Sequence, residues 1–457
     1  MYEINIIITV ILWILIVFIY SLSKSASVYN PTTFYLFFHG LAFVVRPIFK
    51  YFYDFQFMYN LYSFSPSEET RNLALIAANI GLISFCAGSY CTGNVRMRFA
   101  AGRIKDSEQA KTFQWGLISG LILSAPWIVD SFNLALSANL TDVDLVNMTS
   151  FEASTGATLY TDTTGYVVDA NLMLGAFGVG LIWAFRFKWY AWIPYLTFCI
   201  LRMSVGWGRF SFMLTLGSVG ILYSFYHGRK WISPRLMVGA VAVIPLFSAI
   251  GTERTLVADW ITGREREVPV WKEDEIAPKH FFDQMDFAQL ECLEYVMAVV
   301  PEKTNSFDYF LDNLEIFTAP IPRMLWKDKP VGSPIQLYNI RDYGTPIGIT
   351  WTVVGEGWQA LGIIGVAIWC FLGGAGWGWL YRLFALSAQT PWQVLAYILI
   401  LPMSVQWFRD GALISLVKFP LFFLLPVVLS RILGPRLVSL LKRDGVVASY
   451  ARIQSGA

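Results

Sequence analysis

The sequence predicts an all-α polytopic membrane protein with about eleven transmembrane helices, each near the 20 residues that a bilayer requires. Of its 457 residues, 56% are hydrophobic and 14% are charged, whereas a soluble protein carries about a quarter charged residues. This apolar surface exceeds what one aqueous core can bury, so lipid must be the solvent. The 34 basic and 32 acidic residues nearly cancel, which leaves no positive field for nucleic acid.

The predicted spans divide the chain into three regions: 1–251 with eight spans, a long loop at 252–352, and 353–457 with three spans. The first run, Ile6 to Leu22, has no basic segment before it, so we expect a retained anchor and not a cleaved signal peptide. The eleven runs are 6–22, 33–50, 72–91, 114–132, 166–186, 189–206, 208–226, 236–251, 353–379, 392–407 and 412–432.

Basic residues in the loops predict the orientation of these spans, because cytoplasmic loops are enriched in lysine and arginine. The opposite loops are acidic or neutral: 51–71 contains a single cation, Arg71, and 133–165 contains none. Alternation then places the N-terminus in the periplasm and the C-terminus in the cytoplasm. The predicted cytoplasmic cations are Arg96, Arg98, Arg103, Lys105, Lys111, Arg186, Lys188, Arg229, Lys230, Arg235, Arg382, Arg436, Lys442 and Arg443.

The same alternation places the loop 252–352 outside the membrane. Loops longer than about 15 residues are usually functional or disordered. Two apolar-periodic runs, Phe287 to Val300 and Phe307 to Phe317, predict amphipathic helices that lie on the bilayer surface or cap a cavity.

Charged residues inside or beside the predicted spans are candidates for function, because membranes exclude charge. One interpretation is that these side chains snorkel to the interface. Snorkelling cations should favour the cytoplasmic side, whereas these gather at the outer side. Such a cluster suggests an anionic ligand, and guanidinium forks suit the phosphate or diphosphate oxygens of a lipid. The candidate cations are Arg46, Arg209, Arg254, Arg323, Arg341, Arg409 and Lys329.

Nothing in the sequence calls for a cofactor or a metal ion. It contains no glycine-rich phosphate loop, no metal-spaced His/Cys/Asp cluster and no serine nucleophile motif. The five cysteines match no metal pattern, and we expect no disulfide framework. His39 and His227 are expected to be structural, whereas His280, at the start of the outer apolar run, could serve as a base or a ligand.

Three segments of the long loop and the start of the next span carry a resemblance to a known family. They are Val299-Val-Pro-Glu, Ile321-Pro-Arg-Met-Leu-Trp-Lys-Asp-Lys-Pro, Gly348-Ile-Thr and Gly355-Glu-Gly-Trp-Gln-Ala-Leu-Gly-Ile-Ile-Gly. With the predicted topology, these segments resemble the Wzy family of bacterial oligosaccharide repeat-unit polymerases, which build O-antigen and related exopolysaccharides.

The resemblance implies a metal-independent, GT-C-like glycosyltransferase of the bacterial inner membrane, acting at the periplasmic face in lipopolysaccharide or related polysaccharide biosynthesis. The donor would be a growing glycan on undecaprenyl diphosphate, and the acceptor a single lipid-linked repeat. The acceptor hydroxyl would attack the anomeric carbon of the donor, and undecaprenyl diphosphate would leave. Membrane lipid and a chain-length-determinant protein are further expected partners.

The chemistry of that reaction assigns roles to the candidates. Arginines fixed at the membrane edge would stabilise the negative charge of the departing diphosphate. The preferred cations are Arg209, Arg254, Arg323 and Arg409, with Arg46 and Arg341 next. A carboxylate near them would act as general base. The candidates, in order of preference, are Glu356, then Asp342 and Asp410, then His280.

Two alternative functions stay open. An O-antigen ligase, which transfers the finished glycan to the lipid A core, shares the fold and the donor. Related ligases often carry a histidine near the start of the span after the long loop, and this sequence has none there. The other alternative is a non-enzymatic transporter or flippase of lipid-linked sugars. Transporters tend to show internal repeats, and we find no convincing repeat here.

Overall fold

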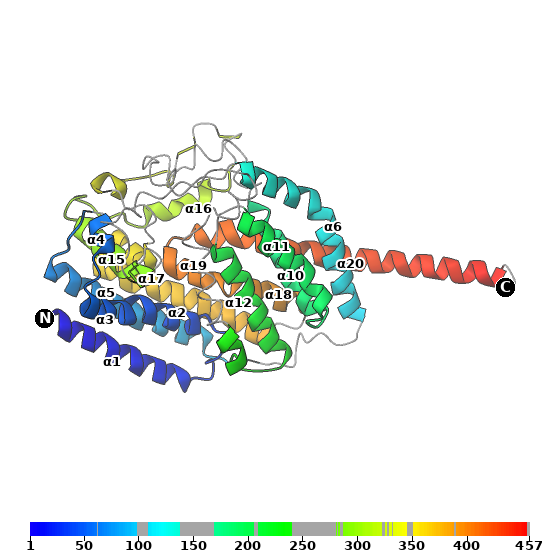
Figure 1. The fold of residues 1–457 in the computed structure, drawn as a ribbon, viewed down its shortest axis with the longest axis horizontal. Coiled ribbons are helices and arrows are strands. Elements are labelled where there is room, and N and C mark those ends of the chain that lie inside the picture. Colours follow the sequence, from blue (N-terminus) through cyan, green and yellow to red (C-terminus); the bar gives the residue numbers. More distant parts are fainter. Residues whose placement is uncertain are drawn as a thin grey trace.

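The part of the chain described by this computed structural model contains helices and no strands (Figure 1). Within that part, six helical segments are long and apolar enough to cross a membrane, and they correspond to six predicted spans. These segments are α1 (Tyr2–Ser21), Pro31–Tyr53, α5 (Glu68–Gly93), the Glu108–Leu134 part of α6 (Glu108–Ser137), α17 (Thr352–Ser387) and the Ser415–Leu440 part of α20 (Ser415–Gln454). The described residues are 1–61, 63–97, 108–137, 169–204, 209–239, 280, 282–283, 287–321, 325–326, 329–330, 332–344, 351–387 and 390–454.

The remaining predicted spans form shorter helices where they are described, so a total of about eleven is not confirmed. The run 166–186 forms α10 (Leu172–Ala184), which is buried on all sides and has the length of a core helix. The run 392–407 is divided near Pro402, because proline lacks the amide hydrogen of a continuous helix. Most of 236–251 lies outside the described residues. The other short helices are η2 (Trp189–Trp192), α11 (Ile193–Ser204), α12 (Arg209–Tyr226), α18 (Pro391–Ile400) and α19 (Met403–Asp410).

Local signals explain where several helices begin. The Ser67 hydroxyl accepts a hydrogen bond from the Thr70 amide at the start of α5. Thr390 and Gln393 form a reciprocal capping box at the start of α18. Both arrangements satisfy amides that the first turn of a helix leaves unpaired. The second span is compound: α2 (Pro31–His39), the π-helix η1 (Gly40–Val45) and α3 (Arg46–Tyr53).

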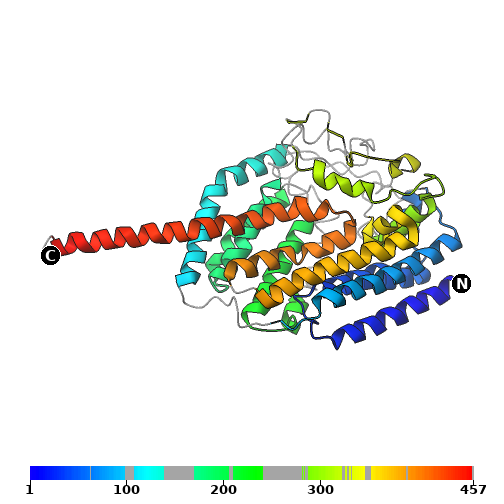
Figure 2. The same cartoon turned by 180° about the vertical axis from the view of Figure 1, so that it is seen from behind.

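Glycine permits two pairs of long helices to approach closely, α5 with α17 and α6 with α20. A Cβ atom on Gly374 would collide with the carbonyl oxygen of Phe85, and one on Gly116 with that of Ser430. Small residues of this kind let helix backbones pack directly against each other in a membrane. Figures 1 and 2 both show α17 alongside α5.

The helix α1 lies at the edge of the bundle in both views (Figures 1 and 2). Its side chains Ile4, Ile7, Ile11 and Phe18 are exposed. A continuous exposed apolar face is what a lipid-facing helix presents. The two termini lie at opposite ends of the molecule, and α20 projects beyond the other helices (Figure 1).

The first predicted loop helix is present as α15 (Gln289–Val299), but it is a core helix. All of its residues except Ala298 are buried. Leu290, Leu293 and Val296 belong to the same apolar cluster as side chains of α5 and α17. The helix therefore packs against the spans, and the expectation that it lies on the bilayer surface is wrong.

The second predicted loop helix, Phe307 to Phe317, is reduced to two short turns, η5 (Leu311–Leu314) and α16 (Glu315–Thr318). Tyr309 and Phe310 have φ angles of 56° and 62°, which interrupt a right-handed helix. The amides of Asp308 and Tyr309 instead donate to carbonyl oxygens of α17, at 2.9 and 3.0 Å. These hydrogen bonds to α17 replace the intrahelical hydrogen bonds that the apolar periodicity of 307–317 predicts.

Candidate functional site

A buried cluster of charged side chains joins α3 to the segment 282–294. Arg46 and Lys50 are four residues apart, and Glu291 and Glu294 are three apart, so each pair lies on one face of its helix. The Arg46 guanidinium donates to Glu291 at 2.8 and 3.0 Å and lies 3.5 Å from Asp283. The Lys50 ammonium lies 3.0 Å from Glu294. These contacts fasten α15 to the second span.

The pKa values of the carboxyl groups in this cluster shift in different directions. Burial raises the pKa of Glu291, but Arg46 and Lys50 outweigh burial and hold that pKa below its usual range. For Glu294, burial and the neighbouring Glu291 outweigh Lys50, and the pKa is raised. Burial also raises the pKa of Asp283. Two cations thus face three carboxyl groups, and the pKa is raised at the two carboxyl groups that the cations compensate least.

Arg46 is one of the predicted diphosphate ligands, and here its charge is already countered. It is 3% exposed, and its guanidinium also donates to the carbonyl oxygen of Phe282 and lies 4.7 Å from the centre of the Phe55 ring. In this arrangement Arg46 holds the loop against the membrane helices. A role in binding diphosphate stays a prediction.

A second cluster forms around Glu356, the preferred base, in the first turns of α17. Glu356 is 4% exposed, and its Oε1 accepts a hydrogen bond from the Asn313 amide at 2.7 Å. The Asn313 oxygen in turn accepts from the Leu413 amide at 2.8 Å. Gly411 packs on the same carboxylate side chain: a Cβ atom there would lie 2.8 Å from that of Glu356. The structure thus brings together the segments around 313, 356 and 409–413.

Two aspartates of the preceding loop extend this cluster. Gln359, one turn after Glu356, donates to Asp312 Oδ2 at 2.8 Å. The Asp312 amide donates to Asp308 Oδ2 at 3.1 Å. Burial, followed by the charge of Asp308, raises the pKa of Asp312 to about 7. Asp312 is only half-buried, so it is a carboxyl group within reach of solvent that titrates near neutral pH.

Polar atoms around these carboxyl groups lack hydrogen-bond partners among the described residues. They include Gln359 Oε1 and the Tyr338 hydroxyl. Burial and the charges of Asp308, Asp312 and Glu356 together raise the pKa of the Tyr338 hydroxyl, which places it near them. Buried polar atoms are normally paired, so unpaired ones mark a position for water or a ligand. We call Asp308, Asp312, Asn313, Glu356 and Gln359 the carboxylate site.

The other predicted bases lie elsewhere or have other partners. Asp410 accepts hydrogen bonds from Gln406 and, at 3.0 Å, from Ser415. Asp342 is exposed in η6 (Ile340–Tyr343). The exposed ring of His280 lies 5.4 Å from that of Tyr53 and 5.8 Å from that of Phe55.

The predicted cations are only partly described. Lys329 donates to the carbonyl oxygens of Ala319 and Ile321, both at 3.0 Å, and so ties that loop together. Arg409 is half-buried, two residues before Gly411. Arg254 and Arg323 lie outside the described residues, as do the side chains of Arg209 and Arg341. Convergence of these cations on one hollow therefore stays a prediction.

Sequence reasoning missed Asp308, Asp312, Asn313 and Gln359. Asp308 and Asp312 stand four residues apart within a run that predicts an amphipathic helix. The sequence did contain a sign of this site: two acidic residues at helical spacing within an otherwise apolar run of a membrane protein. Gln359 lies three residues after Glu356, on the same helical face.

No protein-family model, curated protein or solved structure matches this chain. In the described ranges, no group of three His, Cys, Asp or Glu side chains is placed to hold a metal ion. The fold and the hydropathy together identify the class of this protein. In its described part it is an all-helical membrane protein with six apolar helices long enough to span a bilayer.

Proposed function

We propose that this chain polymerises undecaprenyl-diphosphate-linked oligosaccharide repeats at the periplasmic face of a bacterial inner membrane. The observation that carries the proposal is the carboxylate site, in which Asp312 and Glu356 gather with Gly411 and Leu413, close in the chain to Arg409. Transfer of a glycan from a diphosphate requires a base and a cation, and this site supplies carboxyl groups for the base. The resemblance of segments 321–330 and 355–365 to the Wzy family supports the same reaction.

Asp312 is the proposed general base. A base works best when its pKa lies near the working pH, and Asp312 meets that condition at about 7. It takes the proton of the acceptor hydroxyl while that oxygen bonds to the anomeric carbon of the donor. The bond from that carbon to the diphosphate breaks, and its electron pair leaves with undecaprenyl diphosphate. Arg409 is proposed to stabilise the charge of that leaving group.

Glu356 receives a positioning role in this proposal. Its carboxyl group is enclosed and accepts from Asn313, so an acceptor sugar would reach Asp312 first. Asn313 is the neighbour of Asp312 and also binds the Leu413 amide. Glu356 therefore fixes the loop that carries the base.

The proposal also includes the topology and the partner that the sequence predicts. They are about eleven spans of GT-C-like arrangement, a periplasmic N-terminus, a cytoplasmic C-terminus and a chain-length-determinant partner. Arg209, Arg254 and Arg323 complete the proposed diphosphate site.

The test is elongation of lipid-linked repeats by the purified full-length protein in detergent, followed by mass spectrometry of the glycans. Wild-type protein is expected to form chains of several repeats. Asp312→Asn should lower kcat by about 10²–10⁴-fold, the usual contribution of a general base. The control Glu302→Gln changes an exposed carboxylate and should retain full activity. Wild-type protein that leaves authentic lipid-linked repeats unextended would refute the polymerase proposal.

Deletion of the gene separates the alternatives. Loss of a polymerase should abolish long chains but leave single repeats attached to lipid A. Loss of a ligase should remove both. Loss of a flippase should leave lipid-linked repeats on the cytoplasmic side of the membrane.

A further inference from the structure

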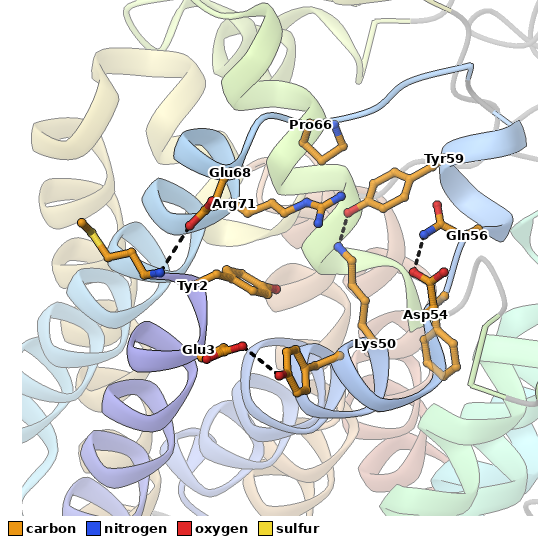
Figure 3. A pocket seen from close by; sticks show the side chains of 12 residues that line it. Tyr2, Glu3, Lys50, Asp54, Gln56, Tyr59, Pro66, Glu68 and Arg71 are labelled. Carbon is orange, nitrogen blue, oxygen red and sulfur yellow. Dashed lines mark hydrogen bonds and ion pairs between the residues drawn. The ribbon is translucent and has the colours of Figure 1, made fainter.

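A cavity of about 580 Å³ lies between the start of α1, the end of α3 and the start of α5. None of the residues of the carboxylate site lines this cavity, so the two sites are distinct. Figure 3 shows Arg71 reaching from α5 toward Tyr59, with the Lys50 ammonium at the hydroxyl of the same tyrosine and Tyr2 nearby. Neither Arg71 nor Tyr2 has a part in the proposed glycosyl transfer.

Of the two cationic side chains that line this cavity, only Lys50 is already paired with a carboxylate of a described residue. Lys50 is committed to Glu294 and to the Tyr59 hydroxyl. Arg71 makes no ion pair with any described residue, and its guanidinium lies 5.5 Å from the centre of the Tyr59 ring. Its Nε atom is buried and lacks an acceptor, as does the Tyr2 hydroxyl. Two donors thus border the cavity without a partner in the described part of the chain.

Unpaired buried donors next to a hollow fit an anionic ligand. A guanidinium presents its N–H groups in a fork that matches phosphate oxygens, and a tyrosine hydroxyl adds a further donor. Arg71 also lies in the first turn of α5, where the helix dipole favours negative charge. A phosphate ester placed between Arg71 and Tyr2 would satisfy both.

Carboxylates at the rim restrict which phosphate ester fits. Glu3, Asp54 and Glu68 line the cavity and are exposed, and Glu68 pairs with the N-terminal ammonium at 3.3 Å. Glu3 and Asp54 make no ion pair with a described residue and oppose a ligand of high negative charge, because like charges in one site repel. They favour a ligand that carries a cation close to its phosphate.

Aromatic side chains beside the cavity indicate its depth in the membrane. Tyr51, Phe52 and Tyr53 at the end of α3 are 53%, 74% and 54% exposed. Aromatic residues of this kind gather at the headgroup level of a bilayer. The exposed isoleucines of α1, from Ile4 to Ile11, continue from the same end of the bundle as an apolar face for acyl chains.

We propose that this cavity binds the headgroup of a zwitterionic phospholipid such as phosphatidylethanolamine. The phosphate contacts Arg71 and Tyr2, and the ammonium group faces Glu3 and Asp54. The site holds a lipid of the bilayer against α1, α3 and α5. It stands independently of the polymerase proposal, because the carboxylate site contributes none of its residues.

The test measures binding of short-chain phosphatidylethanolamine to the full-length protein in detergent by native mass spectrometry. Short-chain phosphatidylglycerol, which lacks the ammonium group, is expected to bind more weakly. Arg71→Gln should weaken phosphatidylethanolamine binding by about tenfold or more, since a hydrogen bond to a charged group contributes about 1.5–3 kcal/mol. Arg229→Gln, a change at an exposed arginine, should leave affinity unaltered.

Two further measurements separate the sources of the ligand and guard against misfolding. Free phosphoethanolamine that binds as tightly as the lipid would support the same chemistry with a soluble ligand. If Arg71→Gln does not give a monodisperse protein, Tyr2→Phe and Asp54→Asn take its place. Tyr2→Phe should weaken binding of both lipids, and Asp54→Asn should reduce the preference for phosphatidylethanolamine over phosphatidylglycerol. Equal affinity of wild-type protein for the two lipids, or unchanged affinity in the variants, would overturn the proposal.

Discussion

Replacing Glu291 with alanine tests whether the buried charged cluster holds α15 on the membrane helices. Glu291 provides the 2.8 and 3.0 Å contacts of the Arg46 guanidinium, and both side chains are 2% exposed. The change leaves Arg46 buried, with only the more distant Asp283 carboxylate at 3.5 Å. Removing one partner of a buried ion pair costs about 3–5 kcal/mol, because a charge remains without its partner.

That cost should appear first as local opening of α15. Each 1.4 kcal/mol changes an equilibrium constant tenfold, so opening should become about two to three and a half powers of ten more frequent. Amide hydrogen exchange reports such local opening directly. We expect exchange in 289–299 to accelerate accordingly in Glu291→Ala protein, while amides in the middle of α6 keep their rates.

Two comparisons make this test specific. Glu302→Ala removes an exposed carboxylate just after α15 and should not change exchange. The double variant Arg46→Met, Glu291→Met removes both charges and should recover part of the protection, since an apolar pair can replace a buried ion pair. Exchange in α15 that is the same in Glu291→Ala and wild-type protein would show that the cluster does not hold the helix in place.

Three further predictions concern the carboxylate site and the proposed diphosphate site. Because the pKa of Asp312 is raised to about 7 in the folded protein, its contribution to stability is full below about pH 4 and is lost as the pH rises through 7. Asp312→Asn should therefore flatten that decline in thermal unfolding measured from pH 4 to 8, and an unaltered profile would contradict the assignment. Gly411 has a φ of 82° and no room for a Cβ atom beside Glu356. Gly411→Ala should cost about 1–3 kcal/mol from backbone strain and lower the Tm, whereas Gly376→Ala, where a Cβ atom meets nothing within 4 Å, should not. Arg209→Ala and Arg323→Ala should each remove polymerisation without reducing protein abundance, and lysine at either position should restore little, because an ammonium lacks the guanidinium fork. Full activity in both alanine variants would remove these residues from the diphosphate site.

The class of protein and six of its spans follow from the sequence alone. The length and apolar character of a run are local properties, and the cost of placing a polar backbone in lipid makes such a run a helix. Starts such as Ser67 and Thr390 are likewise encoded within one turn. Glu356 and Arg409 could be selected as candidates because charge near a membrane span is costly wherever the span packs.

Tertiary structure alone decided which of these charges meet. Arg46 and Glu291 are 245 residues apart, and the local sequence of neither helix predicts that the two side chains form an ion pair. The period of 307–317 predicted a helix, but hydrogen bonds to Gln359 and Ala360 replaced it with turns. That exchange brought Asp312 beside Gln359 and enclosed Glu356, which moved the proposed base from the predicted residue to one 44 positions before it. Hydrophobic periodicity records how a segment buries its own apolar face, whereas partner choice among buried polar groups depends on which segments the folded chain brings within hydrogen-bonding distance.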